Sequence, residues 1–126
     1  MKTSELSGAA LDWAVAKCLA VDGFGAREVQ LGEYGPLFGK GYLWPSLGST
    51  KVTASTNWSQ GGPIIERNGI NLLQNTFHST YWEASIGSLD DHERPAEIGP
   101  TPLIAAMRCF VSSKLGDDVE IPEELK

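Results

Sequence analysis

The sequence contains few cysteines and histidines, and this scarcity limits metal and disulfide chemistry. Among 126 residues there are two cysteines, Cys18 and Cys109, and two histidines, His78 and His92. None of them has a neighbour at the spacing of a zinc site. Both cysteines fall in segments with helical periodicity, so we expect buried free thiols, no structural metal and no cofactor.

Long apolar runs are also missing. No stretch approaches the roughly 20 apolar residues that a membrane-spanning helix needs. The amino-terminal segment MKTSELSGAALDW lacks the basic start and apolar stretch of a secretory signal. We therefore expect a cytoplasmic protein that does not bind a membrane.

Positive charge is scarce and scattered. The chain has 10 Lys and Arg against 16 Asp and Glu, and residues 88–126 alone carry four against nine. Polymeric nucleic acid binds clusters of cations that release its counterions, and no basic stripe is visible. We expect no binding to DNA or RNA, although a few separate arginines could hold one small phosphorylated molecule.

The composition is that of a folded globular chain. Hydrophobic residues make up 41% and charged residues 21% of the sequence, far from the composition of disordered chains. The length suits one domain with an ordinary core. We expect a single domain over residues 1–126, with residues 117–126 as an acidic tail.

Two segments have the pattern of helices. The first predicted helix, residues 7–20, opens with Ser7 in a capping position. It places five apolar residues on one face: Leu11, Ala14, Val15, Cys18 and Leu19. Residues 102–115 lie between a capping Thr101 and a terminal Gly116. The small residues of this second segment could form a bland exposed face or contact a second subunit or another helix: Ala105, Cys109, Ser112 and Ser113.

The segment between these helices has the pattern of short strands and loops. Nine of the 14 glycines lie between Gly23 and Gly62. Strands are predicted at residues 27–31, 51–55, 63–67, 70–74 and 79–85, with 63–67 and 70–74 as a hairpin around Asn68-Gly69. The predicted fold is therefore α+β, with two helices packed on a small antiparallel sheet and Gly-rich loops.

Recognisable catalytic motifs are missing as well. No G-x-G-x-x-G occurs, and the GKG at residues 39–41 is not followed by Ser or Thr. The cysteines lie in helix interiors rather than at helix amino ends, where a thiolate would be favoured. We expect a protein without catalytic residues; the alternative of a small nucleotide-processing enzyme would need Glu66 or Glu83 as its general acid or base.

A binding site is the stronger hypothesis. Trp58 and Gln60 stand beside Gly61 and Gly62, which we interpret as a loop outside any helix whose amides could approach an anion. The turn at residues 99–102 exposes the amino end of the second helix, a position that favours anions. Isolated arginines suit phosphate, with ion pairs to neighbouring acids as the alternative: Arg27, Arg67 and Arg108.

Three stretches, SELSGAALDWAVAK, WSQGGPIIER and GPTPLIAAMRCFVSSKLGD, resemble the NinX family of short phage and prophage proteins. The resemblance spans nearly the whole chain. It implies a phage accessory protein that is made inside an infected bacterium. The family has no established catalytic residues, so the resemblance implies no mechanism.

The length, the helix-sheet-helix order and the spacing of arginines and aromatics are also similar to phage sponge proteins. Those proteins counter the Thoeris defence by sequestering a cyclic ADP-ribose signal, and some also hold cyclic oligonucleotides. This second resemblance implies a homo-oligomer, a dimer or a dimer-based hexamer, with small-residue helix faces as subunit contacts. If this resemblance holds, side-chain chemistry and rough placement suggest the ligand-binding residues: Arg27, Trp82 and Arg108 for a pyrophosphate and a base, and the Asp90–His92 turn, with Asp91 and His92, for ribose hydroxyls.

Two other functions stay open at this point. One is an accessory protein that acts through a host or phage protein partner, using its acidic tail or an apolar patch. The other is the nucleotide-processing enzyme. The leading hypothesis is a non-catalytic protein that sequesters a nucleotide-derived immune signal.

Overall fold

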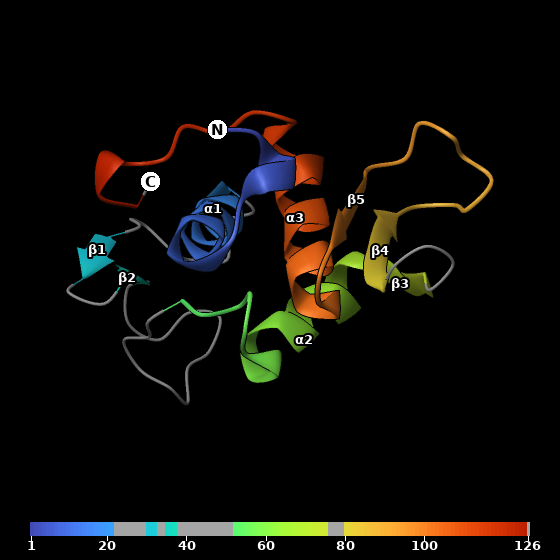
Figure 1. Ribbon diagram of the computed structural model, residues 1–126, viewed down its shortest axis with the longest axis horizontal. Helices are drawn as coiled ribbons and strands as arrows, with labels where there is room; N and C mark the ends of the chain where they lie inside the picture. The colour runs from blue at the N-terminus through green and yellow to red at the C-terminus, as the bar shows by residue number, and fades with distance from the viewer. Residues whose placement is uncertain (22–29, 33–34, 38–51, 76–79, 126) are drawn as a thin grey trace.

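The computed structural model describes residues 1–21, 30–32, 35–37, 52–75 and 80–125 (Figure 1). It contains helices α1 (Gly8–Val21), α2 (Trp58–Asn68) and α3 (Pro102–Leu115), with short 3-10 helices η1 (Thr3–Glu5) and η3 (Glu123–Leu125). Strands β1 (Gln30–Gly32) and β2 (Gly35–Leu37) form one antiparallel pair. A second antiparallel sheet has the order β3 (Ile70–Asn75), β4 (Tyr81–Ile86), β5 (Ala96–Gly99). The predicted α+β class is confirmed.

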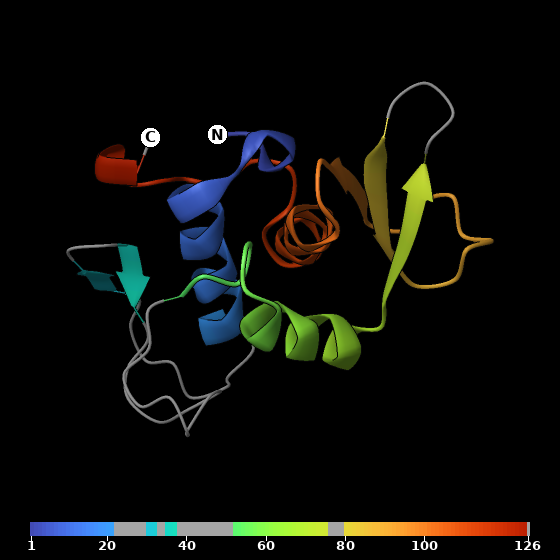
Figure 2. The same cartoon turned by 60° about the horizontal axis from the view of Figure 1, so that its bottom comes forward.

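Helix α3 occupies the centre of the molecule. In Figure 2 it lies between the three-stranded sheet on one side and helices α1 and α2 on the other. Its ends are those that the sequence predicts: Thr101 Oγ1 accepts the Ile104 N–H at 3.1 Å, and the Gly116 N–H donates to the Ser112 carbonyl at 3.0 Å. Seven of its residues are buried: Leu103, Ala105, Ala106, Met107, Cys109, Phe110 and Val111.

The small-residue face of α3 contacts the sheet. Cys109 Sγ lies 3.5 Å from the Pro95 carbonyl oxygen, just before β5. A Cβ at Gly99, the last residue of β5, would lie 2.7 Å from the Ala105 nitrogen, so this position is restricted to glycine. The face is therefore occupied by the sheet of the same chain, which is neither the exposed face nor the subunit or helix contact that the sequence suggests.

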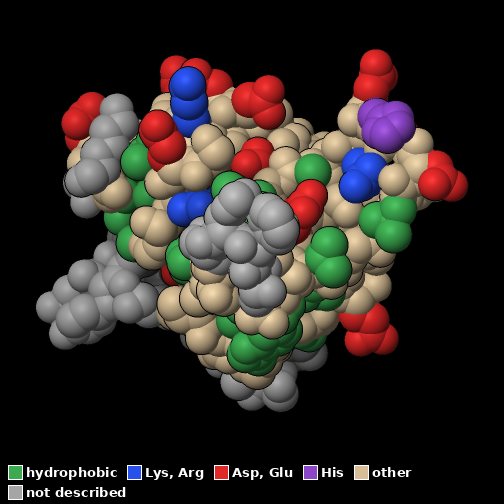
Figure 3. Space-filling model, turned by 45° about the vertical axis from the view of Figure 1, so that its right-hand side comes forward, with side chains coloured by type: hydrophobic (Ala, Val, Ile, Leu, Met, Phe, Trp, Pro, Cys, Tyr) green, Lys and Arg blue, Asp and Glu red, His purple; other side chains and the backbone are tan. Residues whose placement is uncertain are grey.

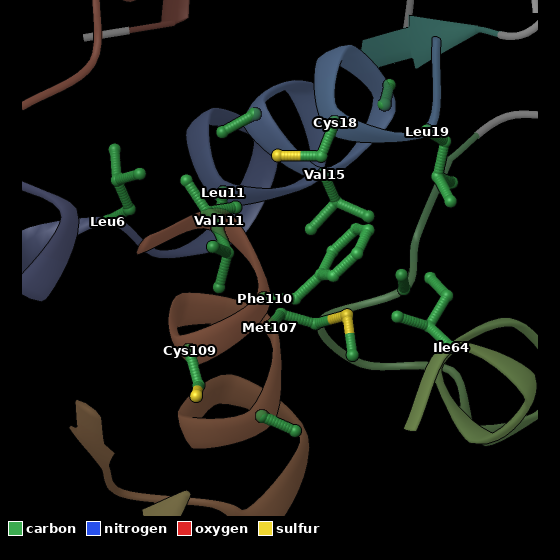
Figure 4. Packing of buried hydrophobic residues seen from close by; sticks show 14 of the residues in the cluster. Leu6, Leu11, Val15, Cys18, Leu19, Ile64, Met107, Cys109, Phe110 and Val111 are labelled. Atoms are coloured by element: carbon green, nitrogen blue, oxygen red, sulfur yellow. The ribbon is translucent and has the colours of Figure 1, made fainter. Parts of the chain in front are cut away.

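Helix α1 packs on α3 from the side opposite the sheet. Its predicted stripe is buried at every position: Leu11, Ala14, Val15, Cys18 and Leu19. Figure 4 shows Val15 pointing toward the Phe110 ring of α3, with Met107 directed toward Ile64 of α2. One continuous core thus joins the three helices.

The three-stranded sheet has one covered face and one open face. Its register pairs Leu72 with Ala84 and Ala84 with Glu97, and the partly buried Leu72 and Trp82 pack against the core. Leu73 and Ile98 alternate to the other face, where they are 63% and 53% exposed. The strands predicted at 70–74 and 79–85 correspond to β3 and β4.

The predicted hairpin over residues 63–74 is wrong, because residues 58–68 form helix α2. Asn57 caps this helix by accepting the Ser59 N–H at 2.9 Å, and Gly69 ends it in the left-handed conformation at φ 61°. The cap at Asn57 and the left-handed Gly69 therefore mark the two ends of a helix. The Ile64-Ile65 pair lies inside this helix, and Asn68-Gly69 ends it instead of forming the turn of a hairpin.

The strand predicted at residues 51–55 is also wrong over its described part. Residues 52–56 end in a turn in which the N–H groups of Thr56 and Asn57 both donate to the Thr53 carbonyl, at 3.0 and 2.9 Å. Of the strand predicted at 27–31, the described residues 30–31 belong to β1. Most of the Gly-rich loops lie outside the described residues.

The two ends of the chain are hydrogen-bonded to each other. The Met1 ammonium lies 3.0 Å from Asp118 Oδ1, and the Val119 N–H donates to the Met1 carbonyl at 2.9 Å. Val119 and Ile121 are buried. The start of the acidic segment 117–126 is therefore packed on the body of the protein.

Gly61 and Gly62 provide a matched test of the packing of α2 on α3. A Cβ at Gly61 would lie 2.5 Å from Leu103 Cδ2 and 2.8 Å from the Ala54 carbonyl oxygen, whereas a Cβ at Gly62 would meet nothing within 4 Å. We expect Gly61→Ala to lower the free energy of unfolding by about 1–3 kcal/mol through overpacking. Urea unfolding followed by circular dichroism measures the change.

Gly62→Ala serves as the control. The gain in helix propensity is opposed by the steric restriction on a residue that precedes Pro63, so we expect a change within about 1 kcal/mol of zero. Equal losses in the two variants would contradict the close contact between α2 and α3.

Candidate functional site

A hollow of about 260 Å³ lies where helices α2 and α3 begin. Seven described residues line it: Ser55, Thr56, Trp58, Thr101, Pro102, Leu103 and Ile104. None of these lining residues is charged. Trp58, the first residue of α2, is 54% exposed and is one of these lining residues.

The turn before α2 is held by buried polar contacts. The Thr53 N–H donates to Gln60 Oε1 at 2.8 Å, and the Ser55 N–H donates to Asp12 Oδ1 of α1 at 2.8 Å. Gln60, Ser55 and Asp12 are all buried. These bonds fix the turn to two helices, so the wall of the hollow that contains Ser55 has a defined position.

The other wall is fixed by the contact between α2 and α3. Gly61 allows Leu103 and the Ala54 carbonyl to approach the α2 backbone closely. The amino ends of the two helices are thereby brought to one hollow. Each end carries about half a positive charge, while the caps already accept the Ser59 and Ile104 N–H groups and Pro102 has no N–H.

This geometry suits a ligand with one hydrogen-bond acceptor or anionic group and one flat apolar group. Concave binding sites are mostly apolar with a few placed polar groups, and Trp58, Pro102 and Ile104 supply the apolar surface here. An exposed indole can stack on a nucleobase. The sequence pointed to both halves of this arrangement, through Trp58 and through the amino end of α3.

Other residues nominated beside Trp58 have mainly packing roles. The N–H groups of Gln60 and Gly61 donate to the Asn57 carbonyl at 3.1 and 2.9 Å, and both residues are buried in α2. The interpretation of residues 58–62 as a loop with amides open to an anion is therefore wrong. Gly62 is half-buried in the same helix.

The structure places several nominated residues away from the hollow. Arg67 is exposed in the last turn of α2, about 13.5 Å along the helix from Trp58. Asp91 and His92 are exposed between β4 and β5, where Asp91 Oδ1 accepts the Glu93 N–H at 2.9 Å. Arg27 lies outside the described residues.

Arg108 joins three parts of the fold. Its Nε donates to the Leu6 carbonyl at 2.8 Å, and its Nη1 donates to the Ile98 carbonyl at 2.9 Å. Burial lowers the pKa of Arg108, an effect that the nearby Glu97 carboxylate opposes. Burial and Asp117 raise the pKa of Glu97. Two of the guanidinium N–H groups thus donate hydrogen bonds to main-chain carbonyls. Trp82, the aromatic residue predicted to act with Arg108, packs against the core.

The two acids that an enzyme would require lie elsewhere. Glu66 is exposed near the end of α2, beside Arg67. Glu83 lines a separate hollow of about 270 Å³ on the open face of the sheet, which Arg94 also lines. Neither acid lines the hollow beside Trp58.

The surface seen from the sheet side carries hydrophobic side chains between separate acidic groups (Figure 3).

Sequence reasoning missed the helix that carries Trp58 and the importance of Ser55. Asn57 and Gln60 have the spacing of a helix-start signal, an N-cap residue followed three positions later by Gln, which would have identified α2. Ser55 gave no comparable signal. Its burial depends on Asp12, which lies 43 positions earlier in the chain.

The fold and the hollow together define a small α+β protein with an uncharged recess at two helix amino ends. Residues 2–114 match the family described as "Bacteriophage P22, NinX". The match covers most of the chain, so the chain belongs to the NinX family of phage proteins. A search of curated proteins finds no match.

Neither a membrane span nor a metal site is found among the described residues. Of the helices they contain, none is long and apolar enough to cross a membrane. Within the same ranges, no group of three or more His, Cys, Asp or Glu residues could hold a metal ion. Cys18 and Cys109 are buried thiols outside any disulfide, as the sequence predicts.

Burial makes the Cys109 thiol a poor acid. Burial, together with the nearby Glu97, raises its pKa from 9.0 to about 12. In the unfolded chain the thiol ionises near pH 9, so the stabilisation is complete below that pH and is lost between about pH 9 and 12. From pH 8 to 10.5, we expect the free energy of unfolding to fall by about 2 kcal/mol more in the parent than in Cys109→Ala.

Urea unfolding of both proteins at the two pH values measures this difference. The Ala variant loses the titrating group while keeping a small apolar side chain. Identical pH dependence in the two proteins would show that the thiol is not held in its neutral form by burial.

Proposed function

We propose that this phage protein binds and sequesters a small nucleotide-derived immune signal without altering it, thereby blocking a bacterial antiphage defence. The proposed ligand is a cyclic ADP-ribose isomer, with cyclic oligonucleotides as a second ligand class. The protein acts in the cytoplasm of the infected cell, as a homo-oligomer.

The observation that carries this proposal is the pairing of an exposed Trp58 with two helix amino ends at one uncharged hollow. A nucleotide combines a flat base with an anionic phosphate, and the hollow offers a complementary group for each. The family membership supports the phage setting. The absence of charge among the described lining residues favours binding over acid-base chemistry at this place.

A protein-binding function is the second candidate. It is favoured by the open face of the sheet, where Leu73, Leu89 and Ile98 are 63%, 65% and 53% exposed. Clusters of exposed apolar residues often mark protein contacts. Affinity capture from infected cells, combined with a blank small-molecule screen, would favour this candidate over sequestration.

Calorimetric titration tests the proposed function directly. The purified chain is titrated with cyclic ADP-ribose isomers and with cyclic oligonucleotides, and the bound ligand is then released by heat and identified by chromatography. We expect saturable binding and recovery of unchanged ligand. A chemically altered ligand would make the protein an enzyme, and Glu66→Gln and Glu83→Gln would then test the two acids.

Trp58→Ala identifies the binding surface. Stacking of one base on an aromatic side chain contributes about 1–3 kcal/mol, so we expect the ligand affinity to fall by roughly tenfold or more. Leu73→Ala is the control, because Leu73 is similarly exposed but lies on the open face of the sheet. Equal affinity in the parent and Trp58→Ala would remove Trp58 from the site.

A further inference from the structure

The direction of the main-chain groups in the three-stranded sheet follows from one hydrogen bond. The Ile86 N–H of β4 donates to the Pro95 carbonyl at 3.0 Å, so the main-chain groups of Ile86 face the β5 side. Along an antiparallel strand, consecutive residues turn these groups to opposite sides. Glu83, three residues earlier, therefore faces β3, where the register pairs it with Leu73. The N–H and C=O groups of Leu73 thus point toward β4.

The outer edge of β3 is open. Because Leu73 faces β4, the N–H and C=O groups of Leu72 and Gln74 point away from the sheet. No main-chain hydrogen bond between described residues reaches them from outside the sheet. Figure 1 shows β3 at the lower rim of the sheet. The helices that contact this strand are α2, which directly precedes it in the chain, and α3, which packs on the face of the sheet.

The opposite edge of the sheet is covered. By the same alternation, the main-chain groups of Ile98 in β5 point outward, and the Ile98 carbonyl accepts a hydrogen bond from Arg108 Nη1 at 2.9 Å. Helix η1 also contacts β5. Proteins usually protect an open edge with charged residues, proline, a bulge or a covering element. Strand β3 has the uncharged sequence INLLQN, without proline, in an unbroken register with β4. The fold therefore protects one edge and leaves the other able to pair.

The composition of β3 favours a second copy of the chain as the partner. Since the strand is uncharged, two copies can pair antiparallel without placing like charges opposite one another. A twofold axis at Leu73 matches the outward groups of Leu72 with those of Gln74 from the second copy. The same axis sets the two Leu73 side chains about 5 Å apart at Cβ. Each of these side chains is 63% exposed in the single chain, so the pairing covers both.

The acidic residue nearest to this axis does not oppose the pairing. Glu83 lies one strand behind Leu73. Three strand spacings, or roughly 14 Å, separate the two copies of Glu83 in the paired sheet. This separation exceeds the screening length of about 8 Å at physiological ionic strength.

We propose that β3 pairs antiparallel with β3 of a second copy, in a twofold dimer centred on Leu73 that joins two three-stranded sheets into one of six strands. This assignment rests on the proposed function in one respect, because it names an interface of the homo-oligomer proposed there. The hollow beside Trp58 takes no part in it. A pairing of so few residues falls among small interfaces, below roughly 1,200 Å² of buried surface. We therefore expect the dimer fraction to rise with concentration.

Two cysteine variants locate the interface. In Leu73→Cys, the Cα atoms of the two copies lie about 4.5 Å apart, within the range of a disulfide. Ile98→Cys is the control, because Ile98 is 53% exposed on the same open face. In the proposed dimer, five strand spacings, or roughly 24 Å, separate its two copies. With oxidised glutathione, we expect a covalent dimer of Leu73→Cys and little of Ile98→Cys on non-reducing electrophoresis. Equal cross-linking of the two variants would overturn the proposal.

Gln74→Pro tests the hydrogen bonds of the edge. Proline removes the Gln74 N–H, which points outward and is not used by the ladder with β4. Gln74→Ala keeps this N–H and is the matched control. Because two hydrogen bonds are lost in each dimer, we expect the dimer dissociation constant to rise about tenfold or more in Gln74→Pro and to change little in Gln74→Ala.

Sedimentation velocity over a concentration series up to about 1 mM measures this constant. Circular dichroism checks that Gln74→Pro is folded, and the two cysteine variants decide the matter if it is not. A parent protein that stays monomeric throughout the series would contradict the proposal.

Titration with the cyclic ADP-ribose isomers separates this inference from the function on which it rests. If the parent binds an isomer and is monomeric both with and without it, sequestration stands and the β3 interface is rejected. If the parent dimerises and Leu73→Cys cross-links, but neither the isomers nor the cyclic oligonucleotides bind, the interface stands and sequestration is rejected.

Discussion

The burial of helix α3 on both sides is the constraint on which the rest of this structure depends. Its apolar side packs against α1 and α2, and its small-residue side packs against the three-stranded sheet. Close approach on both sides requires glycine at Gly61 of α2 and at Gly99 of β5. Arg108, the one charged residue in the middle of α3, joins it to main-chain carbonyls of Leu6 and Ile98. The central helix thereby fixes where its own amino end and that of α2 meet.

The binding site that we propose lies at that meeting point, in a chain with few cations. The protein has a net charge of −6, yet the described residues of the hollow are uncharged and receive the partial charges of two helix ends. At physiological ionic strength, screening over about 8 Å weakens repulsion from distant exposed acids. Local backbone groups can then determine whether an anion binds. In the proposed site, the two helix ends take the anion-binding role that the sequence suggests for Arg27, Arg67 and Arg108.

Much of the fold follows from local sequence signals, while the site depends on contacts between distant segments. Thr101, Pro102 and Gly116 predict both ends of α3, and the apolar stripe of α1 predicts its buried face. Helix α2 was missed because its two glycines, Pro63 and two isoleucines suggested a loop and a strand, although Asn57 and Gly69 mark its ends. The position of Ser55 depends on its bond to Asp12. No local pattern could have predicted it.

We propose that a nucleotide-type ligand binds where α2 and α3 begin. Amide chemical-shift mapping by ¹H–¹⁵N NMR, on addition of a cyclic ADP-ribose isomer, tests it most directly. We predict that the largest shift changes fall at the start of the two helices and the turn before α2: Ser55, Thr56, Trp58, Leu103 and Ile104. Shift changes centred on Arg67, or on Asp91 and His92, with an unchanged hollow would contradict the claim.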